Sequence, residues 1–81
     1  MKILEAVIKY EDNDPINDQN LFDVLWDNRL SLAAKGLYAC IAGGICYQIG
    51  VDEIDTSDGR AEIEKAFAEL VKYGYAREME I

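Results

Sequence analysis

The chain has 81 residues, of which 51% are apolar, and it carries a formal net charge of −8. These totals predict one small globular domain over residues 1–81 and exclude intrinsic disorder. The charge repels DNA, RNA and anionic membranes and favours a basic partner, although an acidic surface can also serve solubility alone.

The sequence gives no sign of secretion, a membrane span or a metal site. It does not open with a basic and then apolar leader, and its longest weakly polar stretch, residues 37–50, is too short and too broken by glycine to cross a bilayer. With no histidine, and with only Cys40 and Cys46 as cysteines, a zinc site is not expected. The polar run at 11–15 lacks the ligand spacing of a calcium loop. We expect both cysteines to be buried and reduced, in a cytoplasmic protein without metal or cofactor.

The chain begins with a predicted strand over residues 1–10, where apolar residues alternate loosely enough to be buried on both faces. Its best partner is a second predicted strand at residues 75–81. A first helix, capped by Asn17 or Asp18, is expected to run to about Asp27. Its apolar face is predicted to consist of Leu21, Phe22, Leu25 and Trp26.

A second helix is predicted over residues 30–45, with Ser31 as its N-cap. Its buried stripe is predicted to consist of Ala34, Leu37, Ile41 and Ile45. The pair Gly43 and Gly44 lowers helix propensity by roughly 1 kcal/mol per glycine. We therefore expect the helix to end or bend there, or another backbone segment to pass close by.

Residues 51–55 are predicted to form the short supporting helix of a helix-turn-helix, with Val51 and Ile54 packed inward. The segment 51–59 contains four acidic residues and no basic one. It is therefore the most one-sided charge cluster in the chain.

A third helix is predicted within residues 58–75. Its start signals are Ser57, Asp58 and Gly59. Gly74 is a stop signal, because glycine suits the left-handed conformation just after a helix. The apolar face of this helix is predicted to consist of Ile63, Phe67, Leu70 and Val71.

Two motifs lie within these helices. Residues 30–38 read Leu-Ser-Leu-Ala-Ala-Lys-Gly-Leu-Tyr, and residues 59–75 contain Gly-Arg-x-x-Ile-x-x-Ala followed by Leu-x-x-x-Gly-Tyr. Both motifs resemble a winged-helix family of phage and plasmid replication proteins, which includes phage replisome organisers and the N-terminal domains of DnaD-like primosomal proteins. The resemblance covers about residues 21–77. It implies an α+β winged helix-turn-helix with three to four helices and a small antiparallel sheet, built here from the N-terminal and C-terminal strands.

The leading functional hypothesis is a protein-binding winged helix from a phage or other mobile element. Its basic partner would meet an acidic edge formed by Asp52, Glu53, Asp55, Asp58, Glu62 and Glu64. One form of this hypothesis is an inhibitor that occupies a nucleic-acid-binding groove on another protein, because carboxylates spaced along a surface can stand in for phosphates. A solvated face with no partner is the alternative explanation of the same residues.

The second hypothesis is a DNA-binding transcriptional or replication regulator that uses the helix at residues 60–73. Its DNA contacts would be Arg60, Lys65, Lys72 and Arg77. Against it, Glu62 and Glu64 occupy the positions that enter the major groove in DNA-binding versions of the fold. Ordinary surface pairing, such as Glu69 with Lys65 or Lys72, would explain the same cations.

An enzyme is not expected, because the chain lacks histidine and no serine or cysteine has an activating base nearby in the sequence. A core position is the default expectation for Trp26, the only tryptophan. A separate prediction is a homodimer that forms through the N-terminal strand as a free edge or through exposed aromatic residues. These aromatic candidates are Tyr10, Trp26, Tyr47 and Tyr73.

Overall fold

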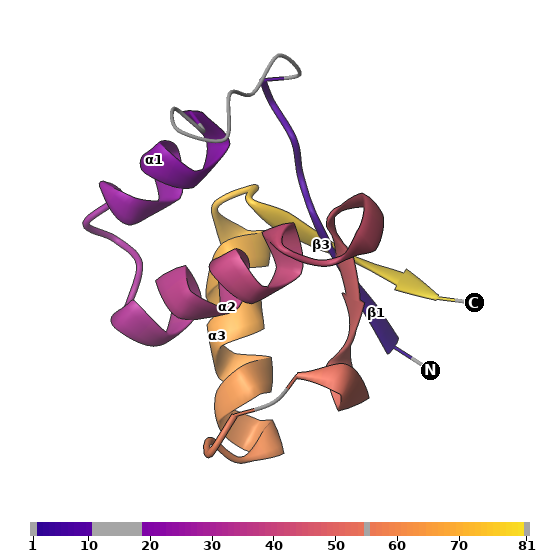
Figure 1. Cartoon of the computed structure of the whole chain (residues 1–81). Coiled ribbons are helices and arrows are strands. Elements are labelled where there is room, and N and C mark those ends of the chain that lie inside the picture. The colour runs from indigo at the N-terminus through magenta and orange to yellow at the C-terminus, as the bar shows by residue number, and fades with distance from the viewer. Residues whose placement is uncertain (1, 11–18, 55, 81) are drawn as a thin grey trace.

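The computed structural model describes residues 2–10, 19–54 and 56–80, which form an α+β fold with three α-helices and one antiparallel sheet of three strands (Figure 1). The α+β class predicted from the sequence is confirmed. The elements in chain order are β1 (Lys2–Ala6), α1 (Gln19–Leu25), α2 (Leu32–Ala42), the 3₁₀ turn η1 (Ile45–Tyr47), β2 (Gln48–Gly50), the 3₁₀ turn η2 (Val51–Glu53), α3 (Arg60–Lys72) and β3 (Ala76–Glu80).

The sheet has the strand order β2-β1-β3, and both pairings are antiparallel. The predicted pairing of the N-terminal and C-terminal strands is confirmed, with Ile3 opposite Met79. The third strand was not predicted, and it places Gly50 opposite Ile3 on the other side of β1. Because β1 is the central strand, the expectation that it offers a free edge is wrong.

The chain reverses between α2 and β2 through an unusually close backbone contact. The helix ends at Ala42 with Gly43 as its C-cap, as the glycine pair predicted. A Cβ atom on Gly44 would lie 2.0 Å from the carbonyl oxygen of Gln48, so only glycine fits there. Cys46 and Tyr47 then adopt left-handed backbone conformations, with φ of 55° and 59°. This turn directs residues 48–50 along β1 as a strand.

The predicted supporting helix at 51–55 is shortened to a single 3₁₀ turn, η2, which follows β2 directly. Val51 is buried and Ile54 is partly buried, so both pack inward as expected. Residue 55 lies outside the described part of the chain.

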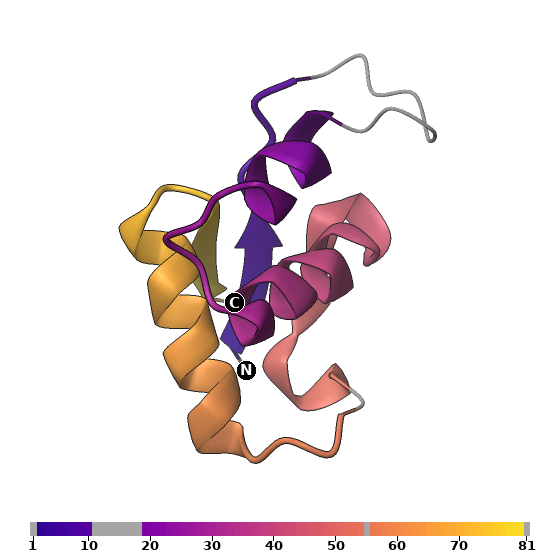
Figure 2. The ribbon, with the colours of Figure 1, turned by 90° about the vertical axis from the view of Figure 1, so that its left-hand side faces the viewer.

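The core lies where α2 and α3 pack against each other and where α2 covers β1 (Figure 2). The predicted stripe of α2 is confirmed at Ala34, Leu37 and Ile41, and Tyr38 is buried as well. The predicted N-cap is also confirmed, because the Ser31 hydroxyl accepts the Ala34 N–H at 3.1 Å.

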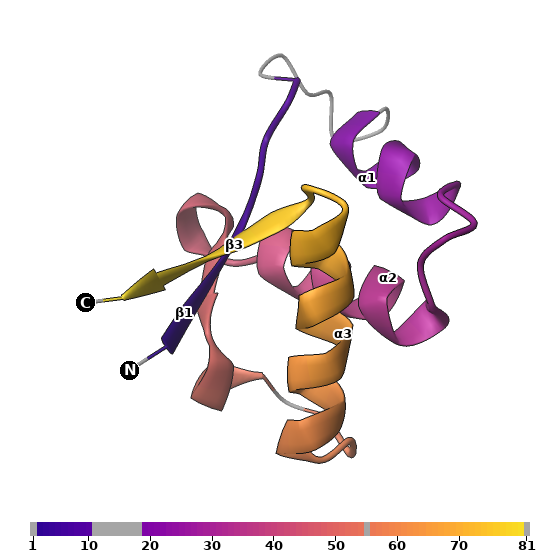
Figure 3. The ribbon, with the colours of Figure 1, turned by 180° about the vertical axis from the view of Figure 1, so that it is seen from behind.

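The C-terminal half of α3 joins this core and leads directly into β3 (Figure 3). Phe67 and Leu70 are buried as predicted, and Ile63 is partly buried. Val71 is 46% exposed, so its predicted core position is wrong, because one residue step turns it about 100° around the helix from Leu70. Gly74 has the left-handed φ of +80° that its stop role predicted.

Glu69 joins α3 to the start of α2 and not to a neighbouring lysine. Its carboxylate accepts the Ser31 N–H at 3.0 Å and the Ser31 O–H at 2.7 Å. These bonds lower the pKa of Glu69, with the backbone bond as the larger cause. The predicted pairing of Glu69 with a lysine is seen only as a weaker electrostatic effect of Lys65, which also lowers the pKa of Glu69, because the carboxylate itself bonds Ser31 at the cap of α2.

The predicted apolar face of helix α1 is confirmed only in part, because Leu21 packs against the core and Phe22 is partly buried, whereas Leu25 and Trp26 are exposed. The buried residues of the helix are Val24 and Asn20, whose side-chain amide bonds the backbone N–H and C=O of Tyr10 and the N–H of Lys9. Trp26 follows the last residue of the helix and is 84% exposed, so its default core position is wrong. Leu25 is also exposed, since the Asn20–Val24 side of the helix faces inward. The predicted caps at residues 17 and 18 lie outside the described residues.

Both cysteines are exposed, so the expectation that they are buried is wrong. Cys40 lies on α2, and Cys46 lies in the turn η1. They share no helix, and both thiols are free.

Two glycine-to-alanine substitutions are expected to change stability in opposite directions. Gly44→Ala should lower the free energy of unfolding by about 1–3 kcal/mol, because the new Cβ would collide with the Gln48 carbonyl. Gly36→Ala should raise it by up to about 1 kcal/mol, because a Cβ there meets no atom within 4 Å and alanine favours the helix. Urea denaturation of the two variants and the wild type provides the measurement. Equal destabilisation by both would contradict the close contact at Gly44.

Candidate protein-interaction surface

The candidate surface surrounds the N-terminal end of α3. The helix begins at Arg60, and the N-cap is Gly59, whose carbonyl oxygen accepts the N–H groups of Glu62 and Ile63. Asp58 lies just before it, and its N–H donates to the Thr56 hydroxyl at 3.2 Å. The start of the helix is therefore held by backbone and loop bonds, and no side chain caps it.

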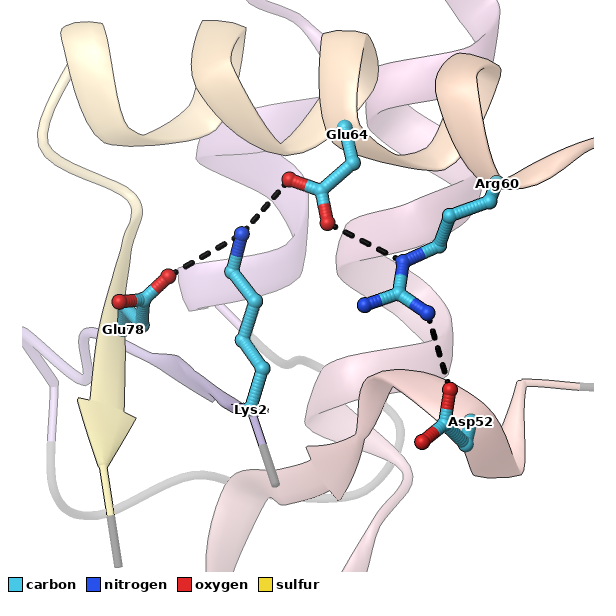
Figure 4. A network of polar contacts seen from close by, with 5 residues as sticks. All are labelled: Lys2, Asp52, Arg60, Glu64 and Glu78. Atoms are coloured by element: carbon cyan, nitrogen blue, oxygen red, sulfur yellow. Dashed lines mark hydrogen bonds and ion pairs between the residues drawn. The ribbon is translucent and has the colours of Figure 1, made fainter.

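Arg60 is the basic side chain at this end of α3, and two carboxylates hold it (Figure 4). Its Nη1 lies 2.9 Å from Asp52 Oδ1 on η2, and its Nε lies 3.2 Å from Glu64 Oε1 one turn along the helix. The other Glu64 oxygen lies 2.6 Å from Lys2 Nζ on β1, which is also 3.1 Å from Glu78 on β3. The network thus links η2, α3, β1 and β3.

The network favours the charged forms of Glu64 and Lys2, its central pair. Hydrogen bonds from Lys2 and then from Arg60 lower the pKa of Glu64. The bond to Glu64 is the main cause that raises the pKa of Lys2. Three carboxylates and two cations take part, so the positive charge of Arg60 is fully compensated within the network.

The structure divides the predicted acidic edge into three parts. Asp52 and Glu64 belong to the ion-pair network. Asp58 and Glu62 line a hollow between α2 and α3, and no cation among the described residues pairs with either. Glu53 lines a separate hollow beside Gly43 and β2. Asp55 lies outside the described residues. Within the described part of this edge, Glu53, Asp58 and Glu62 therefore have no cation partner, and Asp58 and Glu62 lie together at the start of α3.

A structural role also accounts for part of this charge. Glu62 lies in the first turn of α3, where a carboxylate stabilises the helix dipole by about 0.3–1 kcal/mol. Its side chain is exposed, and no side-chain cap hydrogen bond forms at the N-cap Gly59. Helix stabilisation does not explain Asp58 in the same way, because that residue precedes the N-cap.

The four cations proposed as DNA contacts do not form one basic surface. Arg60 is paired within the network, and Arg77 on β3 pairs with Glu5 across the sheet. Lys72 lies over the Tyr73 ring, with its Nζ 5.4 Å from the ring centre. Lys65 is exposed on α3. Two of the four cations are therefore already neutralised by carboxylates.

The aromatic residues proposed for dimerisation are exposed to different degrees. Trp26 projects into solvent beside a shallow hollow lined by Phe22 and Tyr75. Tyr10 and Tyr47 are both 43% exposed, while Tyr73 is partly buried under Arg29, whose guanidinium carbon lies 4.3 Å from its ring centre. Trp26 is therefore the most accessible of the four.

A second polar cluster joins the end of α1 to the start of β3. The Asp27 carboxylate accepts a 2.7 Å bond from the Tyr75 hydroxyl and a two-point ion pair from Arg29. The bonds from Arg29, followed by the bond from Tyr75, hold the pKa of Asp27 far below its usual range. These groups pair with one another, so the cluster connects the end of α1 to the start of β3.

The part of the chain that the structure describes contains no group of three or more Cys, Asp or Glu side chains placed to hold a metal ion. None of the helices found there is long and apolar enough to pass through a bilayer.

Comparison with protein families, with curated protein sequences and with solved structures found no match for the chain.

The ion-pair network makes a testable prediction about pH. Glu64→Gln should lower the free energy of unfolding at neutral pH by less than about 1 kcal/mol, because the network is largely exposed. The lowered pKa of Glu64 means that its contribution is present above the unfolded pKa of about 4.3 and is lost as the pH falls through the folded value. Thermal unfolding at several pH values should therefore show the two curves converging in acid.

Glu53→Gln is the matched control for this measurement, since it removes an exposed carboxylate with no ion pair among the described residues. It should not lower stability at neutral pH. Equal losses for the two variants would show that total charge, and not the network, produces the effect.

Proposed function

We propose that the protein is a non-enzymatic interaction module that binds a basic surface of another protein with the N-terminal end of α3. The observation that carries this proposal is the pairing of the charged side chains at the start of α3. Asp58 and Glu62 have no cation partner among the described residues, while the neighbouring Arg60 is held by Asp52 and Glu64. A net charge of −8 would also steer a basic partner toward the molecule.

The proposal includes a winged helix-turn-helix of the phage or mobile-element type. In its support, α2 and α3 pack together, α3 leads through Gly74 directly into a strand, and the sheet is small and antiparallel. The single turn η2 in place of a supporting helix is a departure from the helix-turn-helix pattern. The resemblance to the winged-helix family rests on the two sequence motifs at residues 30–38 and 59–75.

In a more specific form of the proposal, the partner is a nucleic-acid-binding protein and this protein is its inhibitor. The carboxylates at the start of α3 would occupy a groove that normally holds phosphates. The position supports this form, because the N-terminal residues of the recognition helix enter the major groove in DNA-binding helix-turn-helix proteins, and α3 takes the place of that helix in the proposed fold.

DNA binding by residues 60–73 is the alternative function, and the contacts give it less support. Binding to DNA requires several uncommitted cations that neutralise phosphates. Arg60 and Arg77 are each paired with carboxylates, and releasing them would forfeit those contacts.

The proposal predicts that charge reversal at Glu62 weakens binding to a basic peptide much more than reversal elsewhere. The probe is a short peptide of lysine and arginine, titrated by calorimetry at several salt concentrations. Glu62→Lys should weaken its binding several-fold, because it replaces a carboxylate of the binding surface with a cation. Asp23→Lys is the matched control, since it makes the same change of charge on α1, at the other end of the molecule from the start of α3 (Figure 1).

The same titrations with duplex DNA of random sequence separate the two functions. The proposal expects no binding to DNA even at low salt. Equal weakening by the two charge reversals would overturn the proposal, because the peptide would then respond to net charge alone. DNA binding that weakens steeply with salt would favour the regulator instead.

A further inference from the structure

The hollow beside Asp58 and Glu62 is a groove between α2 and α3, with a volume of about 290 Å³. We call it the α2–α3 groove. Its walls are mainly apolar, and its largest apolar side chains are Leu32, Leu37, Ile54 and Ile63. A volume near the lower end of the range for small-molecule sites, about 300–1,000 Å³, suits one or two amino-acid side chains.

The groove is open because the chain provides too little structure to cover it. Residues 51–55 were expected to form a short supporting helix. The 3₁₀ turn η2 has only three residues, and Ile54 after it reaches just one wall of the groove. Apolar surface between the two helices is therefore left uncovered by the described residues.

Gly36 on α2 lines the groove, and the fold itself does not require a glycine at this position. A Cβ atom there would meet no other atom within 4 Å, and the residue lies inside a helix with no left-handed backbone. Glycine costs about 1 kcal/mol relative to alanine in a helix interior. The residue thus lowers the stability of α2 and keeps the groove wide, which allows a bound side chain to approach the helix backbone.

The rim of the groove defines the charge of its occupant. Asp58 and Glu62 are its charged lining residues, and neither forms an ion pair with a described cation. Leu32 stands at the rim and is 87% exposed, so it offers further apolar contact to anything bound there. An apolar floor beside two carboxylates is complementary to a large apolar side chain flanked by lysine or arginine.

We propose that the α2–α3 groove is the recognition site for a basic segment of the partner protein. One large apolar side chain of that segment enters the groove beside Gly36, and Asp58 and Glu62 bind the lysine or arginine residues that flank it. This inference rests on the proposed function and adds to it the chemistry of the partner segment.

The test uses three synthetic peptides and the full chain. The first has a phenylalanine between lysine and arginine residues, the second has serine in place of the phenylalanine, and the third keeps the phenylalanine between serines. The wild type should bind the first peptide about ten to a hundred times more tightly than the second, the gain expected from burying one large apolar side chain. It should bind the third peptide much more weakly than the first, because the flanking charges are absent.

Gly36→Leu adds a side chain that projects into the groove from a position where a Cβ atom meets nothing within 4 Å, and leucine favours the helix, so the variant is expected to fold. It should bind the first peptide no more tightly than the second. Ala39→Leu is the matched control, because it adds a leucine to an exposed position of α2 that does not line the groove, and it should keep the wild-type preference. Thermal unfolding confirms that both variants are folded.

The Cys40 thiol provides a second measurement, because it lines the groove and is free and exposed. In a Cys46→Ser background it is the only thiol of the chain. The first peptide at saturating concentration should slow the reaction of Cys40 with a maleimide reagent several-fold. An unchanged rate would overturn the proposed position of the bound side chain.

The outcomes separate this inference from the proposed function. If the first and second peptides bind equally and Glu62→Lys weakens both, the acidic surface binds basic partners but the groove takes no side chain. If neither basic peptide binds at low salt, the proposed function fails together with the inference. If the third peptide binds as tightly as the first, the groove binds apolar groups without regard to charge, and the basic partner is wrong.

Discussion

The close approach of Gly44 to the Gln48 carbonyl is the constraint on which the rest of the structure depends. It lets the chain turn back sharply after α2, so that residues 48–50 pair with β1 and make it the central strand. The turn η2 follows directly after this strand, and Ile54 behind it forms one wall of the α2–α3 groove. One tight backbone contact therefore sets the course of the chain that forms both the third strand and this wall of the groove.

The net charge of −8 does not show which charged side chains of the molecule are paired and which are not. Lys2 and Arg60 are each shared between two carboxylates, so the network joins the sheet to α3 while it neutralises the local cations. Each exposed ion pair contributes little to the free energy of unfolding. The network has a larger effect on the charge of the surface, because Asp58 and Glu62 stay without a cation partner beside the groove.

The proposed binding mode combines an apolar side chain for affinity with carboxylates for orientation and rate of encounter. Burial of the side chain would supply most of the binding free energy, because exposed charge pairs are screened by water and salt. The acidic rim would exclude acidic partners and select basic ones. A glycine that costs the helix stability is consistent with a surface arranged for a ligand more than for the fold.

The sequence by itself determined the α+β class, the cap at Ser31, the ends of α2 and α3, and the pairing of the terminal strands, because these depend on local signals and periodicity. Only the tertiary structure decided that Trp26, Val71 and the cysteines are exposed, because burial depends on which elements pack together. It also decided which predicted acidic residues stay uncompensated. Arg60 finds its partners on η2 and one turn along α3, and Lys2 reaches Glu64 from a distant strand. Spacing along the chain cannot reveal such contacts, since they form only when the sheet and the helices meet.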